Sequence, residues 1–174
     1  MTLLMCTLPL TLPNNMRVIS IDPGYDRIGV AVMELDNDQE KLIYSCCIET
    51  NKSDELYLRL TQLGREFEQL LIAHSPTAVA IETIFFNKNV TTAMGVAQAR
   101  GIFIYLSQIH NCAFYEFGPQ EIKVAVTGYG KSDKGAVIDM VKRLVPSAPA
   151  TALDDEYDAI AVGITCLAHY GRNK

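Results

Sequence analysis

The sequence predicts an α/β fold: a mixed sheet of three antiparallel strands followed by parallel strands, with helices on both faces. Three short apolar runs open the chain, a segment with helical apolar spacing follows, and strand-like and helix-like segments then alternate. With 174 residues, of which 49% are hydrophobic, the chain is long enough to form one domain around one core.

The first three strands are expected at residues 18–21, 28–35 and 42–48. Asp36-Asn37-Asp38 supplies turn residues between the last two of these runs, which favours an antiparallel meander. The stretch before Met16 is apolar, but it lacks Lys and Arg and contains prolines, which argues against a secretory signal. We interpret residues 1–15 as an N-terminal extension, disordered or not native, and residues 16–174 as a single domain.

Helices and strands alternate over the rest of the chain. Leu56, Leu60 and Leu63 begin a series of apolar residues at three- and four-residue spacing, which is typical of an amphipathic helix. Pro76 ends that helix. The predicted elements are a helix at 54–74, a strand at 77–82, a helix at 91–110, a strand at 112–117, and helices at 119–126, 134–144 and 155–169.

Charge and cysteine content restrict the partners and the compartment. The formal net charge is -5, so the chain as a whole gives no electrostatic reason to bind nucleic acid, although Lys and Arg outnumber Asp over residues 123–143. The five cysteines are odd in number and show no Cys-x-x-Cys spacing. We therefore expect no disulfide framework, no zinc site, no membrane segment and a cytoplasmic location.

Two of the predicted strands end in a carboxylate. Asp22 closes the first apolar run, and Glu82 closes the run that ends at Ile81. If these strands are neighbours, their ends lie about 5 Å apart. Two anions at that spacing are costly to desolvate unless a cation lies between them.

More acids stand at the start of the last predicted helix. Asp155 and Asp158 are three residues apart and share a helix face. Together with the two strand-end acids they make four carboxylates on rigid elements, which suits a hard divalent cation, and a two-metal cluster can cleave phosphodiesters. Each acid also has a plainer explanation: Asp22 as a turn residue before Pro23-Gly24, Glu82 as a solvated strand end, and Asp154 as a helix cap.

Five groups of motifs follow one another along the chain. They are Ile21-Asp22-Pro23-Gly24 with Gly29-Val30-Ala31, the segment Ile81–Asn89, Gly118–Lys123 with Ala125–Gly130, Asp133-Lys134, and Asp155–Ala161. Each is weak to moderate alone, but their order and spacing are specific. From Met16 to about His169 the sequence resembles the RuvC family of Holliday-junction resolvases, which are crossover junction endodeoxyribonucleases.

The resemblance implies a ribonuclease-H-like fold, a homodimer, and paired nicks in opposed strands of a four-way DNA junction. It also implies a branch-migration partner, the RuvA–RuvB complex. Carried over residue by residue, it implies that the catalytic, metal-binding acids are Asp22, Glu82, Asp155 and Asp158, with two Mg²⁺ ions for which Mn²⁺ can substitute. Asp154 stays an alternative to Asp155 as the third ligand. Finally, the resemblance implies DNA-binding roles for Lys123 and Lys134 near the scissile strand and for Phe85 at the opened junction centre.

The principal hypothesis is therefore a metal-dependent, structure-selective endonuclease of DNA recombination and repair that leaves 5'-phosphate products. One alternative is an actin-like phosphotransferase fragment, because Asp-x-Gly followed by a turn and Gly29 also looks like a phosphate loop. Such kinases need two lobes around ATP, and this chain supplies one. The other alternative is a junction-binding module that does not cut.

The helix at 91–110 is the candidate dimer interface. Small residues along it permit close approach of another helix, although packing against its own sheet explains them equally well. These residues are Gly95, Ala97, Ala99 and Gly101.

Overall fold

A five-stranded sheet with the strand order β3-β2-β1-β4-β5 lies at the centre of the structure, a computed structural model that describes residues 16–36, 39–83 and 90–171. β2 is antiparallel to β1 and β3, whereas β1 is parallel to β4 and β4 to β5. The predicted mixed sheet is therefore confirmed. The strands are β1 (Arg17–Asp22), β2 (Arg27–Asp36), β3 (Gln39–Glu49), β4 (Ala78–Glu82) and β5 (Ala113–Phe117).

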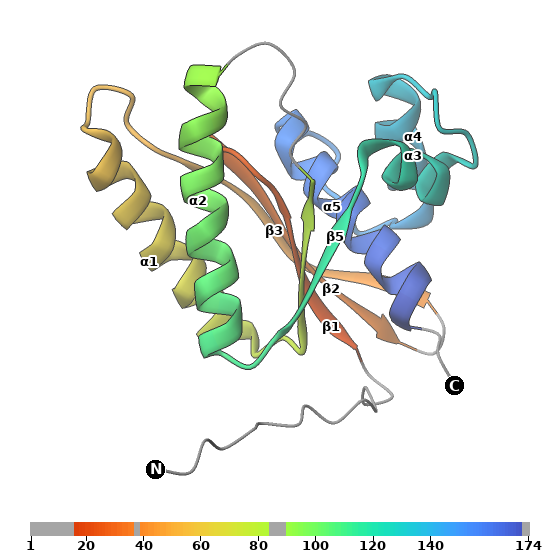
Figure 1. Ribbon diagram of the computed structural model, residues 1–174. Coiled ribbons are helices and arrows are strands. Elements are labelled where there is room, and N and C mark those ends of the chain that lie inside the picture. Colours follow the sequence, from red (N-terminus) through yellow and green to blue (C-terminus); the bar gives the residue numbers. More distant parts are fainter. Residues whose placement is uncertain (1–15, 37–38, 84–89, 172–174) are drawn as a thin grey trace.

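Helices cover both faces of the sheet (Figure 1). On one face lie α1 (Leu56–His74) and α2 (Val90–Ile109), and on the other α5 (Asp154–Cys166) packs against β1 and β2. The pair α3 (Pro119–Thr127) and α4 (Lys134–Leu144) packs on α5. The last helix was expected to reach His169, but its α-helical part ends at Cys166 and continues as the π-helical turn η1 (Leu167–Gly171).

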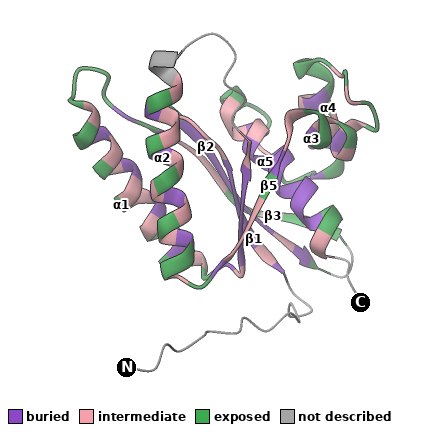
Figure 2. Cartoon of the chain, in the orientation of Figure 1, coloured by how far each residue is buried: buried purple, intermediate pink, exposed green. Residues whose placement is uncertain are grey.

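Side-chain alternation divides the core into two layers. Ile19 and Ile21 of β1 are buried with Phe67 of α1 and Phe103 of α2. Val18, which has the opposite parity, is buried with residues of α5. Because successive side chains of a strand point to opposite faces, Asp22 shares the α5 face with Val18. Figure 2 shows the buried residues concentrated on the central strands and on α5.

Two glycines allow α5 to lie directly on the sheet. A Cβ atom on Gly29 of β2 would be 1.7 Å from the carbonyl oxygen of Asp155. A Cβ atom on Gly163 would be 2.6 Å from Sδ of Met33. The close approach at Gly29 places the first turn of α5, which carries the acids, against the end of β2 that pairs with Asp22.

Met16 is 1% exposed in the core, and its carbonyl oxygen accepts a hydrogen bond from Leu35 N at 3.2 Å. Met16 is thus part of the folded core. Residues 1–15, which we interpret as an N-terminal extension, lie outside the described ranges. The cysteines that the structure describes are free thiols. Among the described helices, none has the length and apolarity that a bilayer span requires.

Candidate active site

Asp22 and Glu82 meet at one edge of the sheet. The parallel register of β1 and β4 pairs Ile21 with Ile81, so the next residue of each strand is an acid. Both acids also have the parity of the α5 face. The structure thus confirms that the two strands are neighbours.

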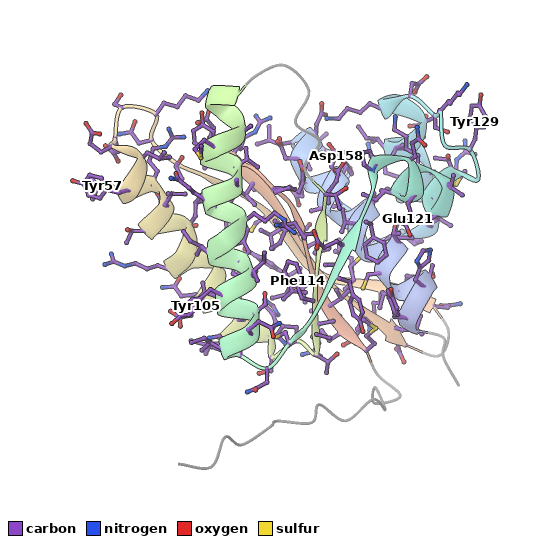
Figure 3. All side chains as sticks on the ribbon, in the orientation of Figure 1. Tyr57, Tyr105, Phe114, Glu121, Tyr129 and Asp158 are labelled. Carbon is purple, nitrogen blue, oxygen red and sulfur yellow. The ribbon has the colours of Figure 1, made fainter. Side chains whose placement is uncertain are left out.

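The first turn of α5 adds Asp155 and Asp158 to this edge. The Asp155 side chain is 20% exposed and that of Asp158 29%, whereas the Asp154 side chain is 59% exposed. Asp155 and Asp158 both raise the pKa of Asp22. Of the two candidates for the third acid, Asp155 is the less exposed, and its backbone lies against Gly29, the residue that pairs with Asp22. Figure 3 shows Asp158 near the ends of β4 and β5.

Burial and mutual repulsion make Asp22, Glu82 and Asp158 hard to ionise. Burial, followed by the charges of Asp158, Glu82 and Asp155, raises the pKa of Asp22 from 3.8 to about 8. Burial also raises the pKa of Glu82 and of Asp158, with a further contribution from neighbouring acids. A group of anions that resists ionisation in this way is stabilised by a bound cation.

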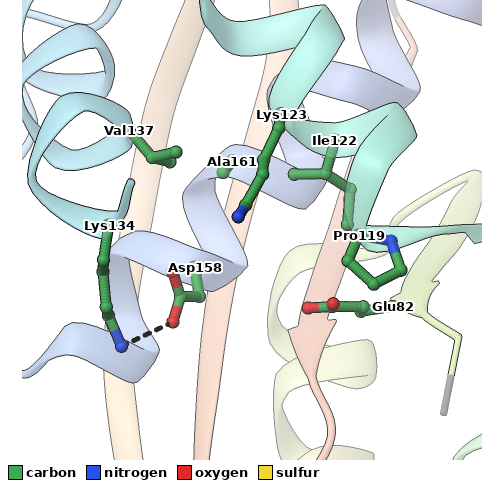
Figure 4. A pocket seen from close by; sticks show the side chains of 8 residues that line it. All are labelled: Glu82, Pro119, Ile122, Lys123, Lys134, Val137, Asp158 and Ala161. Atoms are coloured by element: carbon green, nitrogen blue, oxygen red, sulfur yellow. Dashed lines mark ion pairs between the residues drawn. The ribbon is translucent and has the colours of Figure 1, made fainter. Parts of the chain in front are cut away.

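Two lysines from the α3–α4 pair face the acids. Lys134 Nζ lies 3.1 Å from Asp158 Oδ2 and 3.2 Å from Asp154 Oδ2, and Lys123 lowers the pKa of Glu82. Both lysines line a cavity of about 230 Å³ together with Glu82 and Asp158, and its remaining walls are apolar (Figure 4). The apolar lining consists of Pro119, Ile122, Val137 and Ala161.

The structure adds a cation that the sequence did not single out. Arg27, the first residue of β2, places Nη2 2.5 Å from Asp155 Oδ2. That oxygen is buried and accepts no hydrogen bond with good geometry from the described residues. The sequence shows that Arg27 lies two residues before Gly29 and therefore on the same strand face. That pattern does not predict an ion pair with an acid more than a hundred residues away in the chain.

Within the described residues, no group of three or more His, Cys, Asp and Glu side chains has the spacing of a formed metal site. The ion pairs explain part of this, because Arg27 and Lys134 each hold one of the acids. The donor set nevertheless fits a hard cation: it consists of carboxylate oxygens, and one of them, Asp155 Oδ2, is buried and accepts no well-directed hydrogen bond from the described part of the chain. Phe85 lies outside the described residues.

The arrangement gathers acids and lysines at the end of a mixed sheet, a set of groups that can hold divalent cations and contact phosphate. A family model described as "Crossover junction endodeoxyribonuclease RuvC" matches residues 18–166 of the chain. The chain belongs to this family. The sheet order and the helices on both faces confirm the ribonuclease-H-like fold that the resemblance implied.

RuvC proteins of two bacteria match almost end to end. The one from Thermosipho melanesiensis is 42% identical over 153 residues, which cover 88% of this chain and 97% of that protein. The one from Alkaliphilus metalliredigens is 37% identical over 156 residues, covering 90% and 94%.

Solved structures agree with the RuvC assignment. A structure described as T. thermophilus RuvC in complex with Holliday junction substrate superposes with a TM-score of 0.83 at 26% identity and covers 90% of this chain and 95% of that one. The yeast mitochondrial Holliday junction resolvase Ydc2 shares the fold, with a TM-score of 0.64 at 12% identity over 90% of this chain and 82% of that one.

Proposed function

We propose that this protein is a divalent-metal-dependent endonuclease that resolves four-way DNA junctions by paired nicks. The observation that carries the proposal is the convergence of Asp22, Glu82, Asp155 and Asp158 from three elements on one face of the sheet, beside Lys123 and Lys134. Membership of the RuvC family supports the same reaction.

The four acids would hold the metal, Mg²⁺ or Mn²⁺, with two ions in each site. When bound, the metal supplies a Lewis acid that activates water and stabilises the leaving oxygen of an in-line displacement at phosphorus. Water attack breaks the bond between phosphorus and the 3' oxygen, so the products are a 5'-phosphate and a 3'-hydroxyl.

The residues around the acids bind and orient the DNA. Lys123 and Lys134 are compact point charges that can contact phosphate oxygens on either side of the scissile bond. The apolar walls of their cavity limit the number of water molecules around the reacting group. Phe85 is proposed to stack on a base at the opened junction centre, where an aromatic face contributes about 1–3 kcal/mol.

A homodimer is part of the proposal, because two symmetric nicks need two active sites related by a two-fold axis. Gly95 and Ala99 of α2 are buried within the chain's own fold. The outward face of α2 instead carries large apolar residues, with Met94, Tyr105 and Ile109 each more than half exposed. We propose this face as the interface.

An actin-like phosphotransferase is disfavoured by the family match, which covers most of the chain. A junction-binding module that does not cut would have no need for four acids at one sheet edge. The RuvA–RuvB complex stays a predicted partner.

The proposal is tested with a synthetic four-way junction beside a linear duplex of the same arms, each incubated with protein in Mg²⁺ or in EDTA. We expect paired, symmetric nicks in the junction in Mg²⁺ only, and little cutting of the duplex. Equal cutting of both DNAs, or junction cutting in EDTA, would contradict the proposal.

A further inference from the structure

Arg27 contacts the acid cluster from a different cleft than the two lysines. Its guanidinium forms an ion pair with Asp155 and lines a cleft of about 500 Å³, separate from the cavity of Lys123 and Lys134. The Arg27 side chain is 44% exposed, so solvent surrounds much of it. Arg27 therefore neutralises Asp155 from the open side of the site.

The ion pair with Asp155 is in conflict with metal binding. Asp155 Oδ2 is buried and has no hydrogen-bond donor with good geometry among the described residues, and Arg27 Nη2 is the cation next to it at 2.5 Å. A divalent ion on that oxygen would stand at about 2–2.6 Å. Arg27 and the metal would then share one carboxylate oxygen, and because like charges repel, the ion pair with Arg27 opposes metal binding there.

A second acid lies within reach of Arg27. Glu49 of β3 is directly opposite Arg27 in the antiparallel register and lines the same cleft. Directly opposed side chains of neighbouring strands have Cβ atoms about 4.5–5.5 Å apart, within reach of an Arg–Glu ion pair. A change of rotamer can thus move Arg27 from Asp155 to Glu49 without moving the backbone.

We propose that Arg27 is a positioning residue that holds Asp155 in the metal-free protein and passes to Glu49 when a divalent cation binds Asp155. Arg27 thereby competes with the metal, and Glu49 offsets part of that competition. The inference rests on the metal site of the proposed function, but it concerns metal affinity and not cleavage.

The test is the affinity of the DNA-free protein for Mn²⁺. It is measured by titration calorimetry and, independently, by the electron paramagnetic resonance signal of free Mn²⁺. We expect R27Q to bind Mn²⁺ about two- to fivefold more tightly, since an ion pair that competes with the metal is gone. E49Q should bind about twofold more weakly, because Arg27 loses its second partner. R27K, which keeps the charge, should stay close to the wild type.

Arg17→Gln is the matched control. Arg17 also starts a strand and pairs with an acid of the sheet, Glu34, at 2.8 Å, but it lies at the opposite end of β1 from Asp22. Its loss should leave Mn²⁺ affinity unchanged. If Arg27 merely oriented Asp155, R27Q would bind Mn²⁺ more weakly, and that result, or an unchanged affinity, would overturn the inference. If the wild type bound Mn²⁺ tightly but did not cut junctions, the proposed function would be wrong, while the inference about Arg27 would still be tested by the affinities of the variants.

Discussion

Among the acids of the site, Asp22 has the most strongly raised pKa. Its carboxylate ends a buried strand, and three other acids surround it, so burial and repulsion raise its pKa to about 8. Near neutral pH the metal-free protein therefore keeps a proton on Asp22 that the unfolded chain has lost. Metal binding would displace that proton, because a carboxylate must be ionised to act as a ligand.

This raised pKa predicts a pH-dependent effect of Asp22→Asn on the stability of the metal-free protein. The contribution of Asp22 to wild-type stability falls as pH rises from about 4 to about 8, because over that range the folded state keeps a proton on Asp22 that the unfolded state has lost. The amide does not titrate. D22N should therefore be more stable than the wild type at pH 8 by about 1–3 kcal/mol, the usual cost of a poorly compensated buried polar group, with less difference at pH 5.

Denaturant unfolding in EDTA at several pH values measures this difference. Asp154→Asn is a suitable control, because the Asp154 side chain is 59% exposed and should show no such trend. A stability difference between D22N and the wild type that is the same at pH 5 and pH 8 would count against the raised pKa.

Single site residues could be predicted where the local pattern of apolar and charged residues marked them. Asp22 and Glu82 stood out because each interrupts an apolar run at its end, and the 3-residue spacing of Asp155 and Asp158 fits one helix face. The ion pair of Arg27 could not be predicted, since its partner comes from a helix that reaches the sheet only through tertiary packing.

At the scale of elements, the close contact between a glycine of α2 and an aromatic ring fixes the position of α2. A Cβ atom on Gly95 would lie 2.9 Å from the ring of Tyr25, which belongs to the turn between Asp22 and β2. The guanidinium of Arg59 from α1 lies 4.8 Å from the centre of the same ring. Arg59 is 7% exposed and also donates to Tyr25 O at 3.0 Å. Tyr25 thus joins α1 and α2 to the turn that follows Asp22.

Gly95→Ala and Gly101→Ala form a matched pair on α2. The first places a methyl group against the Tyr25 ring, so we expect a loss of about 1–3 kcal/mol in the free energy of unfolding. The second places its new Cβ more than 4 Å from every described atom outside its own stretch of helix, so it should gain about 0.5–1 kcal/mol from helix propensity. Denaturant unfolding measures both; two changes of the same sign would argue against the close packing at Gly95.

Element types followed from hydrophobic periodicity and turn residues, and the structure bears them out along the described chain. The boundaries moved by a few residues, as at β3, which begins at Gln39 and not at 42. That part of β3 is polar and largely exposed, so its pairing with β2, and not an apolar pattern, makes it a strand.

At the scale of the whole molecule, the proposed interface and the active site lie on different sides of the sheet. Tyr57 and Tyr105 project from the outer side of α1 and α2, while Asp158 lies on the α5 side (Figure 3). Tyr105 is 63% exposed and Tyr129, on the α3–α4 turn, 61%. The two tyrosines are therefore equally accessible, but only Tyr105 belongs to the apolar face of α2.

Tyr105→Glu should weaken the proposed dimer about tenfold or more, because it buries a charge at an apolar contact. Tyr129→Glu should leave it intact. Sedimentation velocity over a range of protein concentrations gives both association constants, with circular dichroism as the check on folding. Equal association of Y105E and the wild type would place the interface elsewhere or remove the dimer.

Asp22→Asn on a labelled four-way junction in Mg²⁺ shows whether the four acids form the metal site that nicking depends on. We expect D22N to bind the junction within about twofold of the wild type, because the lysines remain, and its single-turnover nicking to fall about a thousandfold or more, because a metal ligand is lost. D154N should nick at nearly the wild-type rate. Nicking by D22N at the wild-type rate would mean that Asp22 is not a ligand of the catalytic metal.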